Sequence, residues 1–97
     1  MASKPLEWSH HAQADVVRAL EFYALTASPI VARRAAEAIK QAAMLIHDYP
    51  LQYREGIKKG TREYVMSRFP YTLVYRVEAK AIRIVRVMHQ AGRYFNV

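Results

Sequence analysis

The stretch that decides the fold is TREYVMSRFPYTLVYRVEAKAIRIVRVMH, residues 61–89. Its many β-branched and aliphatic side chains are typical of strands. Two short interruptions, at 68–70 and 78–80, contain the proline and polar residues of turns. We therefore predict three strands, at about 62–67, 71–77 and 81–88. Because the connections between them are short, neighbouring strands should pair antiparallel.

Basic side chains are threaded through this predicted sheet: Arg62, Arg68, Arg76, Arg83 and Arg86. Residues 1–50 hold five basic and five acidic side chains, whereas residues 51–97 hold ten basic and three acidic ones, so the whole net charge of +7 lies in the second half. Three carboxylates cannot neutralise ten cations. The excess favours an anionic partner, either nucleic acid or an acidic protein segment. A basic surface that serves only solubility is the other interpretation.

Two helices are predicted ahead of the sheet. The first starts after Ser9, a favoured N-cap residue, and fades near Thr26. Apolar residues recur along it at spacings of three and four, and Asp15 falls off that stripe. The pair Ser28-Pro29 starts a second helix, because serine caps helices and proline is favoured in the first turn. This helix should stop at about residue 48, since the residue before Pro50 disfavours helical geometry.

The remaining segments complete the order β-α-α-β-β-β. Residues 4–8 contain Pro5, so a strand there would lie at a sheet edge, and the connector 50–60 leads from helix to sheet. The short link between the helices predicts an antiparallel hairpin. We therefore predict an α+β fold of two layers, with the helical hairpin packed on one face of a twisted, mainly antiparallel sheet. At 97 residues, the chain 1–97 should form a single domain.

The composition argues against several classes of protein. No apolar run approaches the roughly 20 residues of a membrane-spanning helix, and the N-terminus lacks the apolar segment of a secretory signal. The chain has no cysteine, and hence no disulfide, thiolate nucleophile or thiolate metal site. His10 and His11 are adjacent and point apart, unlike a pair of metal ligands. We expect a cytoplasmic protein with no metal, no cofactor and no membrane partner.

An ordered set of short motifs resembles the RelE/ParE toxin superfamily over about residues 6–94. The N-terminal half contributes Trp8, Ala12-x-x-Asp15, Ser28-Pro29 and Tyr49-Pro50. The C-terminal half contributes GTRE at 60–63, PYTLVYRV at 70–77, and IRIVRVMH at 82–89 followed by Arg93. The resemblance implies the same β-α-α-β-β-β fold and a toxin of a bacterial type II toxin–antitoxin module. A cognate antitoxin would neutralise it by wrapping it with an extended, often acidic segment.

Two activities compete within that superfamily. RelE-like members are ribosome-dependent mRNA interferases, whereas ParE-like members poison DNA gyrase. RNA cleavage needs a base for the 2′-hydroxyl, cations for the phosphorane charge and an acid for the leaving oxygen. Here Thr72 stands where RelE-like members place an arginine, and the sequence ends at Val97, before RelE's terminal tyrosine. The ending at 86–89 is similar to that of ParE and the plasmid-stabilisation branch, so we favour a non-enzymatic, gyrase-directed toxin.

The candidate site residues differ between these two activities. For an mRNA interferase, whose partners are the ribosome and mRNA, the catalytic set would be His89, Arg62, Arg93 and Tyr94, with His89 as a general acid or base. For binding of gyrase or of the antitoxin, the candidates are cations that can match phosphate or carboxylate groups. They are Lys58, Lys59, Arg62, Arg68, Arg86 and Arg93.

These candidates also have purely structural interpretations. His89 could be a strand-end histidine bonded to the backbone, and the arginines could pair across strands with Glu63 or Glu78. A third function, a plain nucleic-acid-binding module, is disfavoured because the sequence carries no recognition motif.

Overall fold

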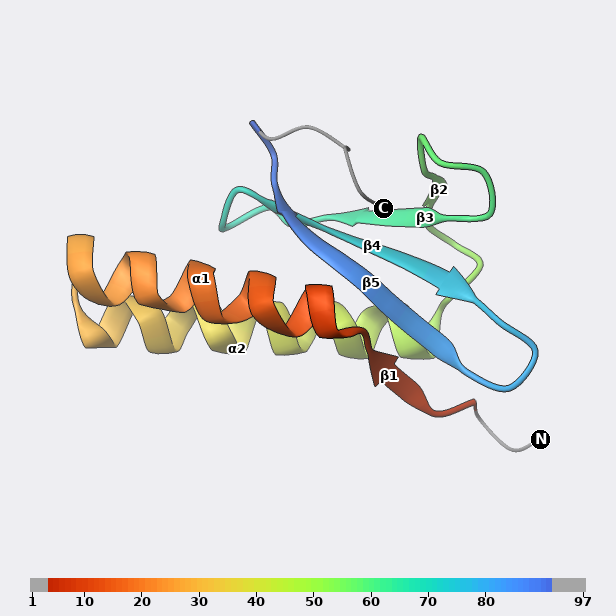
Figure 1. Ribbon diagram of the computed structural model, residues 1–97, viewed down its shortest axis with the longest axis horizontal. Coiled ribbons are helices and arrows are strands. Elements are labelled where there is room, and N and C mark those ends of the chain that lie inside the picture. The colour runs from red at the N-terminus through yellow and green to blue at the C-terminus, as the bar shows by residue number, and fades with distance from the viewer. Residues whose placement is uncertain (1–3, 92–97) are drawn as a thin grey trace.

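A computed structural model of the chain describes residues 4–91. Within these residues two helices and five strands follow one another along the chain. They are β1 (Leu6–Trp8), α1 (His10–Thr26), α2 (Pro29–Asp48), β2 (Arg54–Glu55), β3 (Arg62–Val65), β4 (Tyr71–Val77) and β5 (Ile82–His89). Figure 1 shows the helix pair lying along the sheet, with the ends of the helices extending beyond it.

The strands of the described chain form one sheet in the order β1-β5-β4-β3-β2. β1 runs parallel to β5, and the other neighbouring strands pair antiparallel. This arrangement confirms the predicted α+β fold of two layers. It adds the two-residue strand β2 inside the connector, where Arg54 pairs with Glu63 and Glu55 with Arg62. It also extends the last strand to His89, one residue beyond the predicted end at 88.

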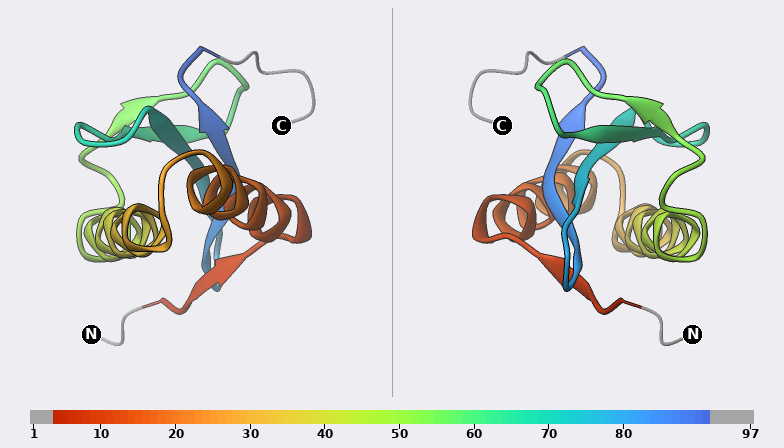
Figure 2. Two further views of the ribbon diagram at one scale, coloured as in Figure 1. Left: turned by 90° about the vertical axis from the view of Figure 1, so that its left-hand side faces the viewer. Right: turned by 90° about the vertical axis from the view of Figure 1, so that its right-hand side faces the viewer.

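Serine side chains start both helices at the predicted places. The hydroxyl of Ser9 accepts a hydrogen bond from the backbone N–H of Ala12 (3.0 Å), and that of Ser28 accepts one from Val31 (3.1 Å). Pro29 follows in the first turn of α2. Figure 2 shows the two helices side by side on one face of the sheet. Small side chains on both helices allow this close packing, and the core lies between them and the sheet.

The core joins the two layers. On the helices it consists of Ala12, Ala19, Ile39, Ala42, Ala43 and Ile46, and on the strands of Met66, Tyr71, Leu73, Tyr75, Ile82, Ile84 and Val87. Alternate residues of β4 point toward the helices, as expected for a strand with one face on the core. On α2 the predicted stripe is confirmed as core at Ala35, Ile39, Ala42 and Ile46. On α1 the buried apolar residues are Ala12 and Ala19, whereas Val16, Leu20 and Tyr23 of the predicted stripe are only partly buried.

The edge of β5 changes its partner halfway along the strand. β1 pairs with residues 82–84 and then ends at Trp8. Beyond that point Ser9 continues the ladder, because its N–H donates to the Ile84 carbonyl (2.9 Å) and its hydroxyl to the Val85 carbonyl (2.8 Å). Further into α1, six residues after Ser9, a carboxylate oxygen of Asp15 accepts the N–H of Val87 (2.9 Å). The start of α1 thus replaces the strand that would otherwise cover this edge.

Asp15 is buried, with only 6 % of its surface exposed. Its Oδ2 accepts a hydrogen bond from Nε of Arg86 (2.8 Å), and its Oδ1 accepts one from Nη2 of Arg86 (3.1 Å) and one from Nη2 of Arg18 (2.6 Å). Burial alone would raise the pKa of Asp15, but the hydrogen bonds from Arg86 and Val87 outweigh it and hold the pKa below its usual value of 3.8. Asp15 is therefore an internal anion, although it falls off the apolar stripe of its helix.

We expect Asp15→Ala to lower the free energy of unfolding by about 3 kcal/mol or more, because it leaves the half-buried Arg86 guanidinium without its carboxylate. It also leaves the buried N–H of Val87 without an acceptor. Urea denaturation followed by circular dichroism measures the change. Glu21→Ala, an exposed carboxylate on the same helix, is the matched control and should change stability by less than about 0.5 kcal/mol. Equal effects of the two substitutions would contradict this role of Asp15.

Stability should also depend on pH through Asp15. Its pKa is lower in the folded chain than in the unfolded one, so the unfolded state binds more protons below about pH 4. The stabilisation from the carboxylate is complete above that pH and is lost as pH falls through the folded pKa. In Asp15→Asn this contribution is absent, so the variant should lose less stability than the wild type between pH 5 and pH 2, as measured by urea midpoints at each pH.

Candidate functional site

Most arginines of the sheet bind groups within the chain. Arg62 donates from Nη1 to the carbonyls of Tyr53 (2.7 Å) and Leu51 (3.3 Å). Arg83 forms ion pairs with Glu7 (2.8 Å) and Glu78 (3.3 Å). The Nη1 of Arg76 donates to the Lys59 carbonyl (3.3 Å), and Arg86 binds Asp15 as described. The structural interpretation, in which Arg62, Arg68 and Arg86 pair across strands with Glu63 or Glu78, is not what the structure has. Glu63 pairs with Arg54 (2.8 Å) and Glu78 with Arg83 (3.3 Å).

Arg68 differs from these residues. It follows β3 in the turn at 68–70 and is exposed. Within residues 4–91 it has no hydrogen bond or ion pair. It lines a groove of about 770 Å³ between α2 and the end of β3. This groove joins a predicted binding residue to apolar side chains, and it is the candidate binding site of the protein.

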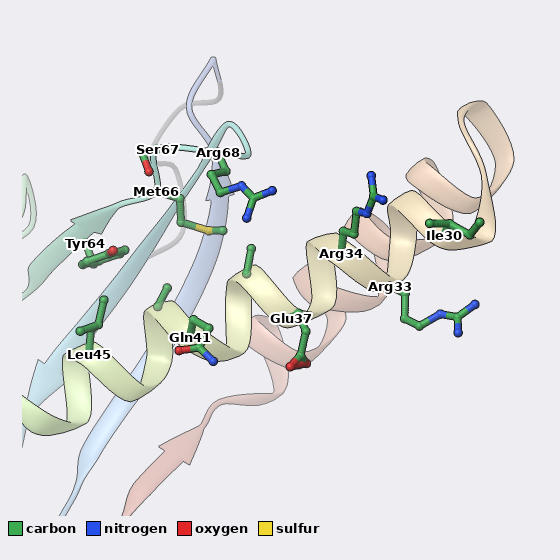
Figure 3. A pocket seen from close by; sticks show the side chains of 12 residues that line it. Ile30, Arg33, Arg34, Glu37, Gln41, Leu45, Tyr64, Met66, Ser67 and Arg68 are labelled. Atoms are coloured by element: carbon green, nitrogen blue, oxygen red, sulfur yellow. The ribbon is translucent and has the colours of Figure 1, made fainter.

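The groove combines an apolar lining with cations. The apolar side chains come from both walls: Ile30, Ala38, Ala42 and Leu45 from α2, and Tyr64 and Met66 from β3 and its end. Two further arginines, Arg33 and Arg34, lie on the α2 wall near its N-terminus. Figure 3 shows Arg34 rising from α2 on the side toward which Arg68 projects, while Arg33 and Glu37 point away. Neither Arg33 nor Arg34 has an ionic or hydrogen-bonding partner among residues 4–91.

Sequence reasoning missed Arg33 and Arg34. They stand in the first turns of α2, beside the apolar stripe rather than on it, which is the usual place for a solvated charge. Glu37 stands four residues after Arg33 and three after Arg34, so the sequence suggests an intrahelical ion pair. The structure shows no such pair among residues 4–91. Their proximity to Arg68 depends on packing between α2 and the sheet, which the local sequence does not encode.

His89 lies at the end of β5, opposite Tyr71 of β4. Its Nδ1 accepts a hydrogen bond from the backbone N–H of Ala91 (3.1 Å), and its ring meets the edge of the Tyr71 ring at 5.3 Å between centroids. Burial raises the pKa of Tyr71, so this phenol stays protonated at neutral pH. The contact of Nδ1 with the backbone agrees with the structural interpretation of a strand-end histidine. His89 also lines a hollow of about 360 Å³ together with Arg18 and Phe22.

The structure does not bring His89 and Arg62 together. Tyr71 stands opposite His89, and Tyr75, four residues further along β4, is nearest to Arg62 on β3. With about 3.3 Å per residue along a strand and about 4.8 Å between strands, the two Cα atoms are roughly 16 Å apart. The Arg62 guanidinium is moreover held on the connector carbonyls. The other two members of the predicted catalytic set, Arg93 and Tyr94, lie outside the described residues.

Lys58 and Lys59 lie in the loop between β2 and β3, at the other end of β3 from the groove. Both are exposed. Within the described part of the chain there is no cluster of three or more histidine or acidic side chains that could hold a metal ion. No helix between residues 4 and 91 is long and apolar enough to cross a membrane.

The sequence model of the family described as the ParE toxin of the type II toxin–antitoxin system, parDE, matches residues 6–94. A protein of Sinorhizobium fredii that bears the toxin name Y4kP is 32% identical over 91 residues, which cover 92% of this chain and 91% of that protein. The chain therefore belongs to the ParE toxin family of type II toxin–antitoxin systems.

Solved structures share the fold at lower identity. The chromosomal ParDE system of P. aeruginosa superposes with a TM-score of 0.82 at 24% identity, covering 90% of this chain and 96% of that one. The DinJ–YafQ complex of E. coli gives a TM-score of 0.62 at 19% identity, with coverages of 93% and 96%. RelBE2 of Mycobacterium tuberculosis gives 0.61 at 19% identity, with coverages of 91% and 99%. The structures named ParDE, DinJ–YafQ and RelBE2 thus share the fold of this chain.

Proposed function

We propose that this protein arrests growth by poisoning DNA gyrase and that a cognate antitoxin holds it inactive. Its membership of the ParE toxin family supports the general assignment. The choice of gyrase over messenger RNA rests on one observation. His89 and Arg62, the two described residues of the candidate catalytic set, lie at opposite ends of the sheet.

RNA cleavage requires an acid, a base and cations around a single phosphate, each within about 3 Å of the group it serves. A separation of roughly 16 Å between Cα atoms prevents two side chains from meeting there when one of them, Arg62, is bound elsewhere. Thr72, in turn, supplies no charge at the position where RelE-like members place an arginine. A toxin that acts by binding needs no such constellation, so these features are compatible with gyrase poisoning.

The groove between α2 and β3 suits an antitoxin segment. Apolar side chains line it, so an amphipathic segment can bury its apolar residues there. Among residues 4–91, Arg33, Arg34 and Arg68 have no hydrogen-bonding or ionic partner, so they can pair with carboxylates of that segment. The ParDE, DinJ–YafQ and RelBE2 structures are named as toxin–antitoxin systems or complexes. We extend this mode of regulation to the present chain.

We expect the purified protein to inhibit supercoiling by DNA gyrase and to increase cleaved plasmid DNA in the same reaction. In cells, induction should stop DNA synthesis before protein synthesis. In His89→Ala the toxicity should stay within about twofold of the wild-type value, because among the described residues Nδ1 of His89 accepts only the backbone N–H of Ala91. The measurements are plasmid topology on gels, and incorporation of labelled thymidine and methionine after induction.

Asp15→Ala, which removes the internal carboxylate, serves as the control for a chain that has lost its fold. Early loss of translation with cleaved transcripts, abolished by His89→Ala, would refute the gyrase assignment. That result would assign the protein to the mRNA interferases instead.

Reversing the charges of the groove should release the toxin from its antitoxin. In the triple variant Arg33→Glu/Arg34→Glu/Arg68→Glu, repulsion replaces attraction for an acidic segment, so co-expression of the small protein encoded by the adjacent reading frame should no longer rescue growth. The affinity of the triple variant for the antitoxin, measured by isothermal titration, should be lower than that of the wild type by about a hundredfold or more. The affinity of the wild-type toxin should itself weaken as salt is raised, because salt screens the charges.

Lys40→Glu is the matched control for this test. Lys40 lies on the same helix and is exposed, but it does not line the groove. This variant should bind the antitoxin as the wild type does. Unchanged binding by the triple variant would mean that the antitoxin uses another surface.

A further inference from the structure

The loop between β2 and β3 presents an unusual group of side chains. Ile57, at its tip, is 73% exposed. Lys58 and Lys59 follow it, are exposed as well, and have no hydrogen-bonding or ionic partner for their ammonium groups within residues 4–91. The loop lies beyond β2 and β3 at the edge of the sheet (Figure 1). An apolar side chain flanked by two cations is therefore held outside the core of the protein.

The backbone of this loop is fixed by its own hydrogen bonds. The N–H of Gly56 donates to the Thr61 carbonyl (2.8 Å), and both the N–H and the hydroxyl of Thr61 donate to the Lys58 carbonyl (3.1 and 2.5 Å). Gly60 has a φ of 82°, a conformation that favours glycine. A Cβ at Gly56 would collide with the Thr61 hydroxyl. Both glycines are thus required by the shape of the loop.

Side chains of the sheet hold the loop and the connector before it. Arg76 donates to the Lys59 carbonyl (3.3 Å), Arg62 to the Tyr53 carbonyl (2.7 Å), and the Tyr75 hydroxyl to the Pro50 carbonyl (2.6 Å). Burial raises the pKa of Tyr75 to about 12, so its hydroxyl stays protonated and remains a donor. Arg62, a predicted anion-binding residue, and Arg76 thus bind backbone carbonyls of this region instead. A loop that served only solubility would not need to be fixed by hydrogen bonds from side chains of the sheet.

We propose that the rigid loop 56–60 is the contact through which this toxin engages its target. The partner is a protein surface with an apolar pocket for Ile57 and carboxylates on its rim for Lys58 and Lys59. An apolar centre with a charged rim is the usual anatomy of a protein interface, and a single buried anchor commonly dominates the binding energy. Because the loop is ordered in advance, binding loses little conformational entropy. A phosphate backbone would use the lysines but would have no need of the isoleucine.

This inference rests on the proposed function only in that the protein acts on a macromolecular target. Residues 56–60 do not line the groove proposed for the antitoxin, which begins at Tyr64 on β3. Target binding and antitoxin binding should therefore be separable by mutation. Growth arrest does not depend on whether the target is gyrase or the ribosome, so it tests the loop independently of the gyrase assignment.

The experiment compares two loop variants with two matched controls. Ile57→Ser and Lys58→Glu/Lys59→Glu change the loop. Leu25→Ser changes another exposed aliphatic residue, 86% exposed near the end of α1, and Lys80→Glu changes an exposed lysine in the turn before β5. Each loop variant should lower toxicity, measured as the surviving fraction after induction, by about tenfold or more. Melting temperature and affinity for the antitoxin should stay at the wild-type values in all four variants.

Three outcomes would overturn the proposal. If Ile57→Ser is fully toxic while Lys58→Glu/Lys59→Glu is not, the loop meets a polyanion such as DNA rather than a protein pocket. If the loop variants lose antitoxin affinity and keep their toxicity, the loop belongs to the antitoxin interface. If the controls lose as much toxicity as the loop variants, the effect is general and the loop has no special role. Wild-type growth arrest without DNA cleavage would refute gyrase as the target and leave this comparison intact.

Discussion

The carboxylate of Asp15 is the constraint on which the two layers of this protein depend. It accepts the backbone N–H of Val87 on β5 and pairs with Arg86, so one side chain of α1 closes a sheet edge and neutralises an internal cation. Burying a charge is costly unless it is paired and hydrogen-bonded, and Asp15 meets both conditions. The position of α1 on the sheet, and through the hairpin the position of α2, follow from this contact. The groove exists because α2 is held beside β3 in that way.

The arginines of the sheet illustrate how charge can be divided between structure and recognition. Arg62, Arg76, Arg83 and Arg86 bind carbonyls or carboxylates of the chain itself. The cations without internal partners in the described structure lie elsewhere, on α2, in the turns after β3 and before β5, and in the loop after β2. The formal charge of residues 51–97 is therefore larger than the charge that the sheet leaves available to bind a partner. Binding roles are proposed for Arg33 and Arg34 on α2, for Arg68 in the turn after β3, and for Lys58 and Lys59 in the loop after β2. The arginines of the sheet hold the backbone on which that loop stands.

Local signals in the sequence were sufficient for the elements but not for the site. Ser9, Ser28 and Pro50 mark helix ends by short-range chemistry, and the predicted boundaries agree with the structure within a few residues. Asp15 was not predicted to be buried, because a helical wheel assigns polar residues to solvent and its partner lies 71 residues away. β2 was missed because two residues carry no periodicity. The groove was missed because it forms only when α2 and β3, which are distant in sequence, pack together.

The order of the strands has a consequence for how the chain is made. β5 is the last strand of the described chain, yet it lies between β1, the first, and β4. Ser9 and Pro5 bind Val85 and Ile82, partners more than seventy residues further along. Contacts of such long range form late, since the intervening chain must first be closed into a loop. A nascent chain on the ribosome therefore cannot complete this sheet, or pack α1 against β5, until synthesis has passed His89.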